Sequence, residues 1–174
     1  MAISQSELTA KSYAYQEKLH TNIRESATAT TRKTAFLCHS HRDDKLVKGL
    51  LVIFREMGVD LYIDWQDHTM PDTPNAETAR KIQTRIKACD QFLFLATENS
   101  KASRWCPWEI GYADSSSKGI YIIPTSDGRN NYGNEYLELY PRIDSAIHNT
   151  TKKEGYAIFH PGKDTGPWLS SSSF

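Results

Sequence analysis

The sequence has few cysteines, no net charge and no long hydrophobic run. Its 174 residues include three cysteines, Cys38, Cys89 and Cys106, which lie far apart and form no paired framework. An odd, sparse set of this kind is typical of reduced thiols and argues against a disulfide scaffold. Lysine plus arginine and aspartate plus glutamate each number 21, so the formal net charge is zero. A broad electrostatic surface for nucleic acid or anionic lipid is therefore not indicated.

Apolar segments of the kind found in signal peptides and membrane spans are also missing. The first thirty residues carry Glu, Gln, Lys and Arg throughout. No stretch approaches the roughly 20 apolar residues that cross a bilayer. We therefore expect a soluble, cytoplasmic protein that binds neither membrane nor nucleic acid. The length suits one domain with modest extensions.

Short uncharged runs alternate with amphipathic helical patterns through the middle of the chain. The expected strands cover residues 34–38, 59–63, 91–96 and 119–123, and the expected helices lie between them. Strand and helix in alternation predict a mostly parallel sheet with helices on both faces. We place this domain at 34–148, with an N-terminal helix and link at 1–33 and a C-terminal extension at 149–174 that contains a short strand at 156–159.

The N-terminal segment predicts a helix over residues 5–27. Tyr15, Leu19 and Ile23 recur at four-residue steps and form a narrow apolar stripe. Two interpretations remain open for this stripe. The favoured one is that the helix packs on its own domain, and the other is that it docks on a second copy of the chain.

In a parallel sheet, ligands bind in the loops that follow the carboxyl ends of the strands. One such loop reads Ser-Arg-Trp-Cys-Pro-Trp-Glu over residues 103–109 and enters a helix in which Pro107 suits the first turn. A carboxylate at Glu109 beside the flat ring of Trp105 suits cleavage of a glycosidic bond on a nucleotide. Glutamate in a first helical turn is, however, most often only a favourable partner of the helix dipole.

Four sequence segments, taken in their order along the chain, indicate a protein family more specifically than the Glu109 segment alone. Residues 36–40 (Phe-Leu-Cys-His-Ser) with Asp43, residues 58–64 (Gly-Val-Asp-Leu-Tyr-Ile-Asp), residues 92–97 (Phe-Leu-Phe-Leu-Ala-Thr) and residues 103–109 resemble motifs of Toll/interleukin-1 receptor (TIR) domains. The resemblance covers roughly residues 34–126. It implies the flavodoxin-like TIR fold, an α/β fold with a mostly parallel central sheet.

The resemblance also implies an activity. Enzymatic TIR domains cleave NAD⁺ into nicotinamide and an ADP-ribose product, which some of them cyclise. NAD⁺ is then a substrate, and no metal is expected. The family pattern assigns the catalytic role to Glu109. It assigns contacts with NAD⁺ to His39, Ser40, Asp64, Trp65, Ser103 and Trp105, of which Trp105 stacks.

A short chain of this kind resembles the stand-alone bacterial TIR proteins of Thoeris anti-phage defence, whose nucleotide product activates a separate effector. Self-association through TIR surfaces is a further expectation. The alternative is a non-catalytic adaptor that works by TIR–TIR association. Residues 65–74 depart from the family pattern because they contain no glycine. The sequence leaves open the form of the ADP-ribose product, the trigger and the preference between NAD and NADP.

Overall fold

The computed structural model describes residues 1–22, 32–67 and 75–173. Its centre is a sheet in the order β3-β2-β4-β5-β7-β8, and two short strands, β1 and β6, pair with β5. The first five strands of that order run parallel, whereas β8 pairs antiparallel with β7 and β6 antiparallel with β5. The strands are β1 Ile3–Ser4, β2 Lys33–Cys38, β3 Val59–Tyr62, β4 Gln91–Ala96, β5 Gly119–Ser126, β6 Asn131–Tyr132, β7 Arg142–Ile147 and β8 Glu154–Phe159.

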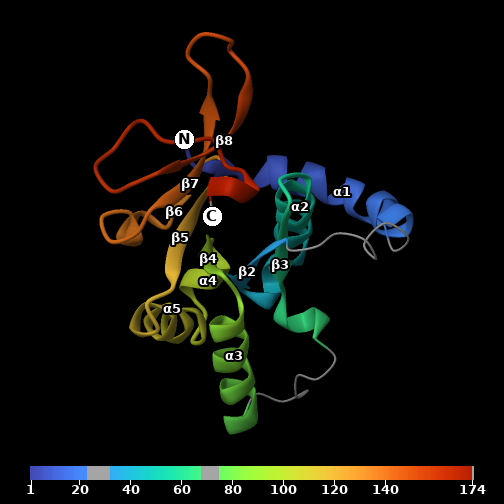
Figure 1. The fold of residues 1–174 in the computed structure, drawn as a ribbon, viewed down its shortest axis with the longest axis vertical. Coiled ribbons are helices and arrows are strands. Elements are labelled where there is room, and N and C mark those ends of the chain that lie inside the picture. The colour runs from blue at the N-terminus through green and yellow to red at the C-terminus, as the bar shows by residue number, and fades with distance from the viewer. Residues whose placement is uncertain (23–31, 68–74, 174) are drawn as a thin grey trace.

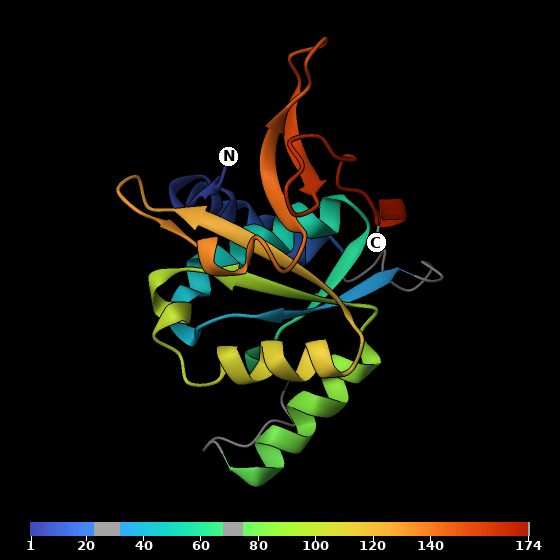
Figure 2. The same ribbon diagram turned by 90° about the vertical axis from the view of Figure 1, so that its left-hand side faces the viewer.

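Helices cover both faces of this sheet (Figure 1). One face carries α1 and α2, and the other carries α3 and α5, as Figure 2 shows from the side. The helices are α1 Gln5–Asn22, α2 Asp44–Glu56, α3 Ala76–Ala88, α4 Glu98–Lys101 and α5 Cys106–Ser115, with short 3₁₀ turns η1 His41–Asp43, η2 Asp64–Gln66, η3 Asn134–Tyr136 and η4 Ser171–Ser173. The expected α/β architecture with helices on both faces is confirmed.

The sheet separates two hydrophobic cores. Successive strand residues point to opposite faces. Ala35 and Leu37 of β2 therefore join the core under α1 and α2, while Phe36 and Cys38 join the core under α3 and α5. Because both faces are covered, β2 and β4 carry apolar residues without alternation. This arrangement sends the side chain of Cys38 towards α5.

The N-terminal helix packs on its own domain, which confirms the favoured interpretation for the described residues. Leu8 of α1 is fully buried in the first core. The hydroxyl of Tyr15 accepts a hydrogen bond from Gln66 at 3.0 Å. The expected continuation of the helix over residues 23–27, including Ile23, lies outside the described residues, as does the side chain of Leu19.

Two segments differ in detail from the sequence-based expectation. Residues 97–104, between the expected strand at 91–96 and the helix that Glu109 enters, contain the additional one-turn helix α4, because Thr97 and Ser100 form a reciprocal capping box. The C-terminal residues 154–159 form β8, which is two residues longer at its start than the expected strand and extends the sheet beyond β7. Most of the glycine-free loop, residues 68–74, lies outside the described residues.

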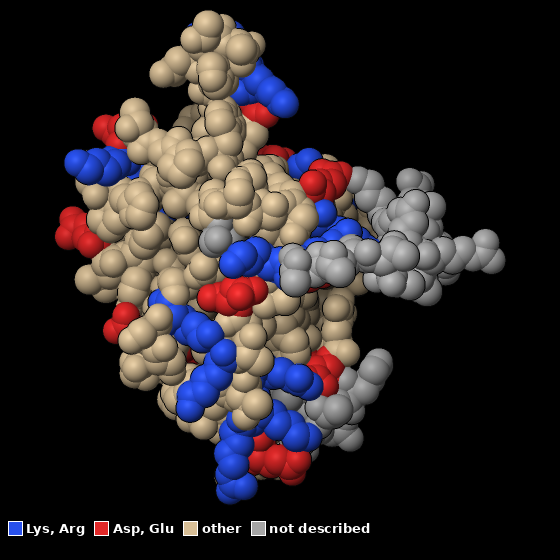
Figure 3. All heavy atoms as spheres, in the orientation of Figure 1, with Lys and Arg blue, Asp and Glu red and all other residues tan. Residues whose placement is uncertain are grey.

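The surface is mixed in charge. Lysine and arginine side chains gather over α3 in the view of Figure 3. Arg85 pairs with Asp67 and Lys81 pairs with Glu77, so this basic face is partly neutralised. Among the helices of the described residues, none is long and apolar enough to cross a membrane.

Candidate active site

The site lies where the carboxyl ends of β2, β3 and β4 meet. Glu109 stands in the first turn of α5, and its backbone N–H donates to the carbonyl oxygen of Trp105 at 2.9 Å. The hydroxyl of Ser103 accepts hydrogen bonds from the backbone N–H groups of Trp105 and Cys106, at 3.2 and 3.4 Å. Ser103 thus satisfies backbone donors at the start of α5. This local arrangement turns the Glu109 side chain inwards, where only 6% of the residue is exposed.

Burial dominates the electrostatics of Glu109. It raises the pKa of the carboxyl group to about 8, although a hydrogen bond from the Cys38 thiol lowers that pKa in part. Charge on Cys106 and Asp64 raises the pKa further, and His41 lowers it. A carboxyl group with a pKa in this range is protonated at neutral pH and becomes ionised when a cation lies beside it. Such perturbed groups concentrate in active sites.

A carboxylate shared by two histidines faces α5 across the site. Nε2 of His41 donates to Oδ2 of Asp64 at 2.8 Å, and the backbone N–H of Trp65 donates to Oδ1 at 2.8 Å. Burial raises the pKa of Asp64, but the hydrogen bond from His41 and the other favourable contacts outweigh burial and hold the pKa below its ordinary value. The same hydrogen bond raises the pKa of His41. Asp64 is therefore ionised near neutral pH, and its carboxylate favours the protonated form of His41.

His39 differs from His41 in protonation, although it lies beside the same carboxylate. Its Nε2 is 3.7 Å from Oδ1 of Asp64, which counts as an ion pair only if the ring is protonated. Burial lowers the pKa of His39, and Nδ1 lies 2.9 Å from the carbonyl oxygen of Leu37. We assign a neutral ring that donates from Nδ1, because burial disfavours the imidazolium form and the carbonyl group needs a donor.

A buried aspartate joins the loop after β2 to the loop after β4. Asp43 accepts hydrogen bonds from the hydroxyl of Thr97 and the side-chain amide of Asn99, both at 2.6 Å. Its own backbone N–H donates to the carbonyl oxygen of Ser40 at 2.9 Å. The hydroxyl of Ser40 in turn accepts from the backbone of Arg42, so Ser40 caps η1. These contacts hold the histidine-bearing loop against the segment that leads to α5.

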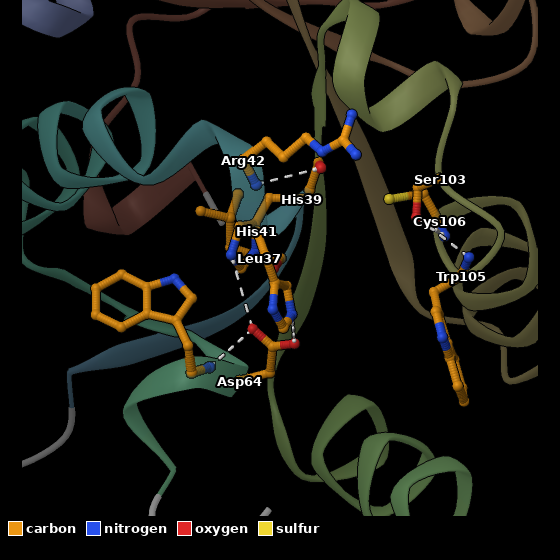
Figure 4. Close-up of polar contacts among 10 residues, drawn as sticks. Leu37, His39, His41, Arg42, Asp64, Ser103, Trp105 and Cys106 are labelled. Carbon is orange, nitrogen blue, oxygen red and sulfur yellow. Dashed lines mark hydrogen bonds and ion pairs between the residues drawn. The ribbon is translucent and has the colours of Figure 1, made fainter. Parts of the chain in front are cut away.

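Aromatic rings border both sides of the site. Trp105 is half-buried, and its ring meets that of Trp108 edge to face at 5.5 Å. Trp65 is exposed and lies 5.9 Å from the ammonium group of Lys48. In Figure 4, Trp105, Ser103 and Cys106 stand opposite Asp64 and the two histidines. Trp105 therefore lies beside the site, as its place in the motif suggests, and on the α5 side.

The structure brings most of the expected residues together. Glu109 is coupled electrostatically to Asp64, and His39 lies beside the same carboxylate. Trp105 stands opposite Asp64 and His39 in Figure 4, and the backbone of Trp65 is hydrogen-bonded to Asp64. The hydroxyls of Ser40 and Ser103 accept backbone hydrogen bonds, so their contacts with a ligand remain predictions. Sequence reasoning did not assign His41, Cys38 or Cys106 to the site. Each of these three residues lies within a motif that contains an assigned residue, and this position could have identified it as a candidate.

A surface groove lies apart from Glu109. A groove of about 500 Å³ lies between the start of α1 and the start of α2, and Glu109 is absent from its lining. We attach the chemistry to Glu109, because the perturbed titratable groups gather there and not in the groove. In the described part of the chain, no three His, Cys, Asp or Glu side chains are grouped as metal ligands would be.

Two proteins with related sequences are named as cyclic ADP-D-ribose synthases. A protein of Bacillus cereus (strain MSX-D12) named "Probable 3′ cyclic ADP-D-ribose synthase ThsB′" is 34% identical over 155 residues, which cover 83% of this chain and 80% of that protein. A protein of Cytobacillus dafuensis named "Putative cyclic ADP-D-ribose synthase TIR2" is 26% identical over 95 residues, 53% of this chain and 25% of that protein.

Similarity to solved structures is more distant. A CMP N-glycosidase of Clostridium botulinum, BcmB, matches with a TM-score of 0.38 and 23% identity, over 52% of this chain and 66% of that chain. The family model described as the TIR domain matches residues 35–154, which include the site and the strands that hold it. From this match and the relative in Bacillus cereus, the chain belongs to the TIR domain family.

Proposed function

We propose that this protein cleaves the bond between nicotinamide and ribose in NAD⁺ and converts the ADP-ribose moiety into a cyclised product. The observation that carries the proposal is the buried carboxyl group of Glu109, with its pKa raised to about 8, at the carboxyl edge of the sheet. The names of the two relatives, both cyclic ADP-D-ribose synthases, support the reaction class.

Cleavage of the nicotinamide–ribose bond needs a group that stabilises positive charge. Nicotinamide leaves with the electron pair of the glycosidic bond, and positive charge develops on the ribose ring. A carboxylate fixed beside that ring stabilises the charge most in a site that excludes water. Because the nicotinamide of NAD⁺ is itself cationic, substrate binding favours the ionised form of Glu109 and displaces its proton.

The other residues bind and orient the substrate in this proposal. Trp105 supplies a flat apolar surface on which an aromatic ring of the substrate stacks. His41 is exposed, and its protonated form, which Asp64 favours, contacts the diphosphate of NAD⁺ in this proposal. His39, Ser40, Asp64, Trp65 and Ser103 complete the contacts with the substrate.

The biological setting follows the resemblance to stand-alone bacterial TIR proteins. The cyclised product acts as a signal in antiviral defence and is read by a separate effector protein in the cytoplasm. Self-association through TIR surfaces completes the site. The glycine-free loop over residues 65–74 sets this chain's own mode of assembly.

The test is nicotinamide release from NAD⁺ by the purified protein over a series of protein concentrations. Glu109→Gln keeps the shape of the side chain but cannot ionise, so we expect release to fall at least ~100-fold. Glu98→Gln is the matched control, because Glu98 is an exposed glutamate in the first turn of α4. It should retain the wild-type rate. Mass spectrometry of the nucleotide product distinguishes cyclic from linear ADP-ribose.

Two results would contradict the proposal. Release that survives Glu109→Gln would remove this residue from catalysis. Absence of release by the wild-type protein at every concentration, together with TIR–TIR association, would instead support the adaptor function.

A further inference from the structure

His39 holds a buried nitrogen that lacks a partner. Only 7% of the residue is exposed, and its Nε2 makes no hydrogen bond with any of the residues that the structure describes. Buried polar atoms are almost always paired, so an unpaired one calls for an explanation. The atom faces Asp64 of the site and not the core, so a role in the proposed cleavage of NAD⁺ would account for it.

The tautomer of His39 gives this nitrogen its chemical character. Nδ1 donates to the carbonyl oxygen of Leu37 at 2.9 Å, which leaves the lone pair on Nε2. That lone pair faces Oδ1 of Asp64 at 3.7 Å. Both atoms are acceptors, and 3.7 Å exceeds the length of a hydrogen bond. Oδ1 of Asp64 already accepts a hydrogen bond from the backbone N–H of Trp65 at 2.8 Å, whereas Nε2 of His39 has no donor. A hydroxyl group that reaches Nε2 therefore finds a free acceptor there.

We propose that Nε2 of His39 is the proton acceptor for the hydroxyl group that attacks the ribose carbon once nicotinamide has left. The inference rests on the proposed function and assigns its second half-reaction. The hydroxyl oxygen, from a ribose of the substrate or from water, gives an electron pair to the new C–O bond. Its O–H bond breaks, and the proton passes to Nε2. The positive charge of the ribose ring thereby ends on the imidazolium.

The surroundings of His39 suit a group that is neutral before this step and charged after it. The titratable groups that act on it are Asp64, at the end of β3, and His41 and Asp43, in η1. Asp64 stabilises the imidazolium once it forms, at 3.7 Å. The ring of His41 stacks on that of His39 at 5.9 Å between centroids and disfavours protonation before the reaction.

The neighbouring groups are less suited to accept this proton. Nε2 of His41 is already hydrogen-bonded to Asp64 at 2.8 Å, and this bond raises the pKa of His41. Asp64 accepts hydrogen bonds from His41 and from the backbone of Trp65. Glu109 is needed as an anion beside the ribose. Glu109 is coupled electrostatically to both His41 and Asp64, so in this proposal the ribose lies between Glu109 and the histidine loop.

The experiment uses two kinds of acceptor. A hydroxyl acceptor must lose a proton when it attacks, and the reaction then gives cyclic ADP-ribose, linear ADP-ribose or, with added methanol, the methyl riboside. A pyridine such as 3-acetylpyridine attacks through its ring nitrogen and releases no proton, and it exchanges with nicotinamide to give the pyridine analogue of NAD⁺. Both acceptors attack the same cation, so Glu109 serves both equally.

The variant His39→Gln keeps a polar side chain but cannot take up a proton. We expect transfer to hydroxyl acceptors to fall at least ~100-fold relative to exchange with the pyridine, the usual contribution of a general base, because any loss of substrate contact lowers both reactions alike. His160→Gln is the matched control, because His160 is exposed and follows β8, outside the site. It should change neither reaction.

A second measurement uses the wild-type protein and does not depend on how the variant folds. The ratio of hydroxyl transfer to pyridine exchange should fall as the pH is lowered from about 8 to about 5, because a protonated His39 cannot accept a proton. The ionisation of Glu109 affects both reactions and cancels in this ratio. In D₂O the ratio should also fall, since only the hydroxyl reaction transfers a proton.

The outcomes separate this inference from the proposed function. If His39→Gln lowers hydroxyl transfer and pyridine exchange equally, or only raises KM for NAD⁺, His39 binds the substrate and the inference is overturned. A wild-type ratio that is constant with pH and unchanged in D₂O overturns it as well. If the wild-type protein neither releases nicotinamide nor exchanges it, the proposed function fails and this inference fails with it.

Discussion

Burial and a thiol act in opposite directions on the carboxyl group of Glu109. Burial raises its pKa, and the hydrogen bond from Cys38 lowers it, with a net value of about 8. The ionised form is the one that stabilises a cationic ribose, so kcat/KM for nicotinamide release should rise with pH and level off above about 8. Burial makes the larger contribution to the pKa of Glu109, and the thiol of Cys38 offsets part of it.

Cys38→Ala tests this role of the thiol. The substitution removes a hydrogen bond that lowers the pKa of Glu109, so the inflection of the kcat/KM profile should move to higher pH. Cys89→Ala is the control, because Cys89 is also buried but lies at the end of α3. It should leave the inflection in place. An unmoved inflection in Cys38→Ala would show that the thiol does not act on Glu109.

The same carboxyl group should make the stability of the fold depend on pH. In the unfolded chain Glu109 loses its proton near its ordinary pKa of 4.5, whereas the folded chain keeps it up to about 8. Its contribution to the free energy of unfolding is therefore present at low pH and is lost as the pH rises between these values.

Glu109→Gln removes that dependence. We expect the variant to gain stability relative to the wild type as the pH rises from about 5 to about 8, as measured by urea denaturation at both ends of that window. A difference between variant and wild type that is the same at both pH values would contradict the raised pKa. A gain in stability together with lost activity is what a strained active site produces.

Between elements, Asp43 links two loops that the site needs. Its carboxylate, on a residue that is 4% exposed, binds Thr97 and Asn99 at the start of α4. The loop that carries the two histidines is thereby fixed to the segment that leads into α5. Loss of this link leaves the buried hydroxyl of Thr97 and the part-buried amide of Asn99 without this acceptor.

Asp43→Ala should therefore destabilise the protein by about 2–4 kcal/mol and lower the rate of nicotinamide release as well. Asp44→Ala is the matched control at the next position. Asp44 pairs with Lys48 one turn along α2 at a half-exposed site, and the loss of such a pair costs less than about 1 kcal/mol. Urea denaturation measures both variants. Equal losses would show that the link between the loops carries no special stability.

On the scale of the whole molecule, the N-terminal helix is part of the structure that supports the site. β1 adds to β5, and α1 lies across α2 at a point of close approach. A Cβ atom at Gly49 of α2 would overlap the backbone carbonyl of Leu8 in α1. α2 begins immediately after the loop that carries His39 and His41, so the position of α1 affects that loop through α2.

Two glycines within helices test this packing. Gly49→Ala should force α1 away from α2 and destabilise the fold by roughly 1–3 kcal/mol. Gly111→Ala in α5 has open space around the new Cβ, so it should stabilise the fold by about 0.5–1 kcal/mol through helix propensity alone. Thermal unfolding measures both. A stabilising Gly49→Ala would mean that the two helices are not in tight contact.

Local sequence patterns were sufficient to predict the strands and helices of the core. β4 has the bounds expected for it, because an uncharged run of six residues between polar turns has few alternatives. α4 was missed, because its existence depends on a capping box of only two side chains in a polar stretch. Among the site residues, the motif positions of Glu109 and Asp64 were sufficient to name them as candidates. His41 was not named, because its hydrogen bond to Asp64 joins positions 23 residues apart.

The sequence by itself determined the order of elements and the parallel sheet, since these follow from periodicity and from the direction of the strands. It also predicted the edge of the sheet at which we expect ligands to bind. It also determined that Glu109 enters a helix at that edge. Only the tertiary structure decided that this carboxyl group is buried against Cys38 and that His39 faces Asp64 with a free lone pair. A pKa and a hydrogen-bond vacancy depend on which atoms from distant loops surround a group, and no local pattern encodes that arrangement.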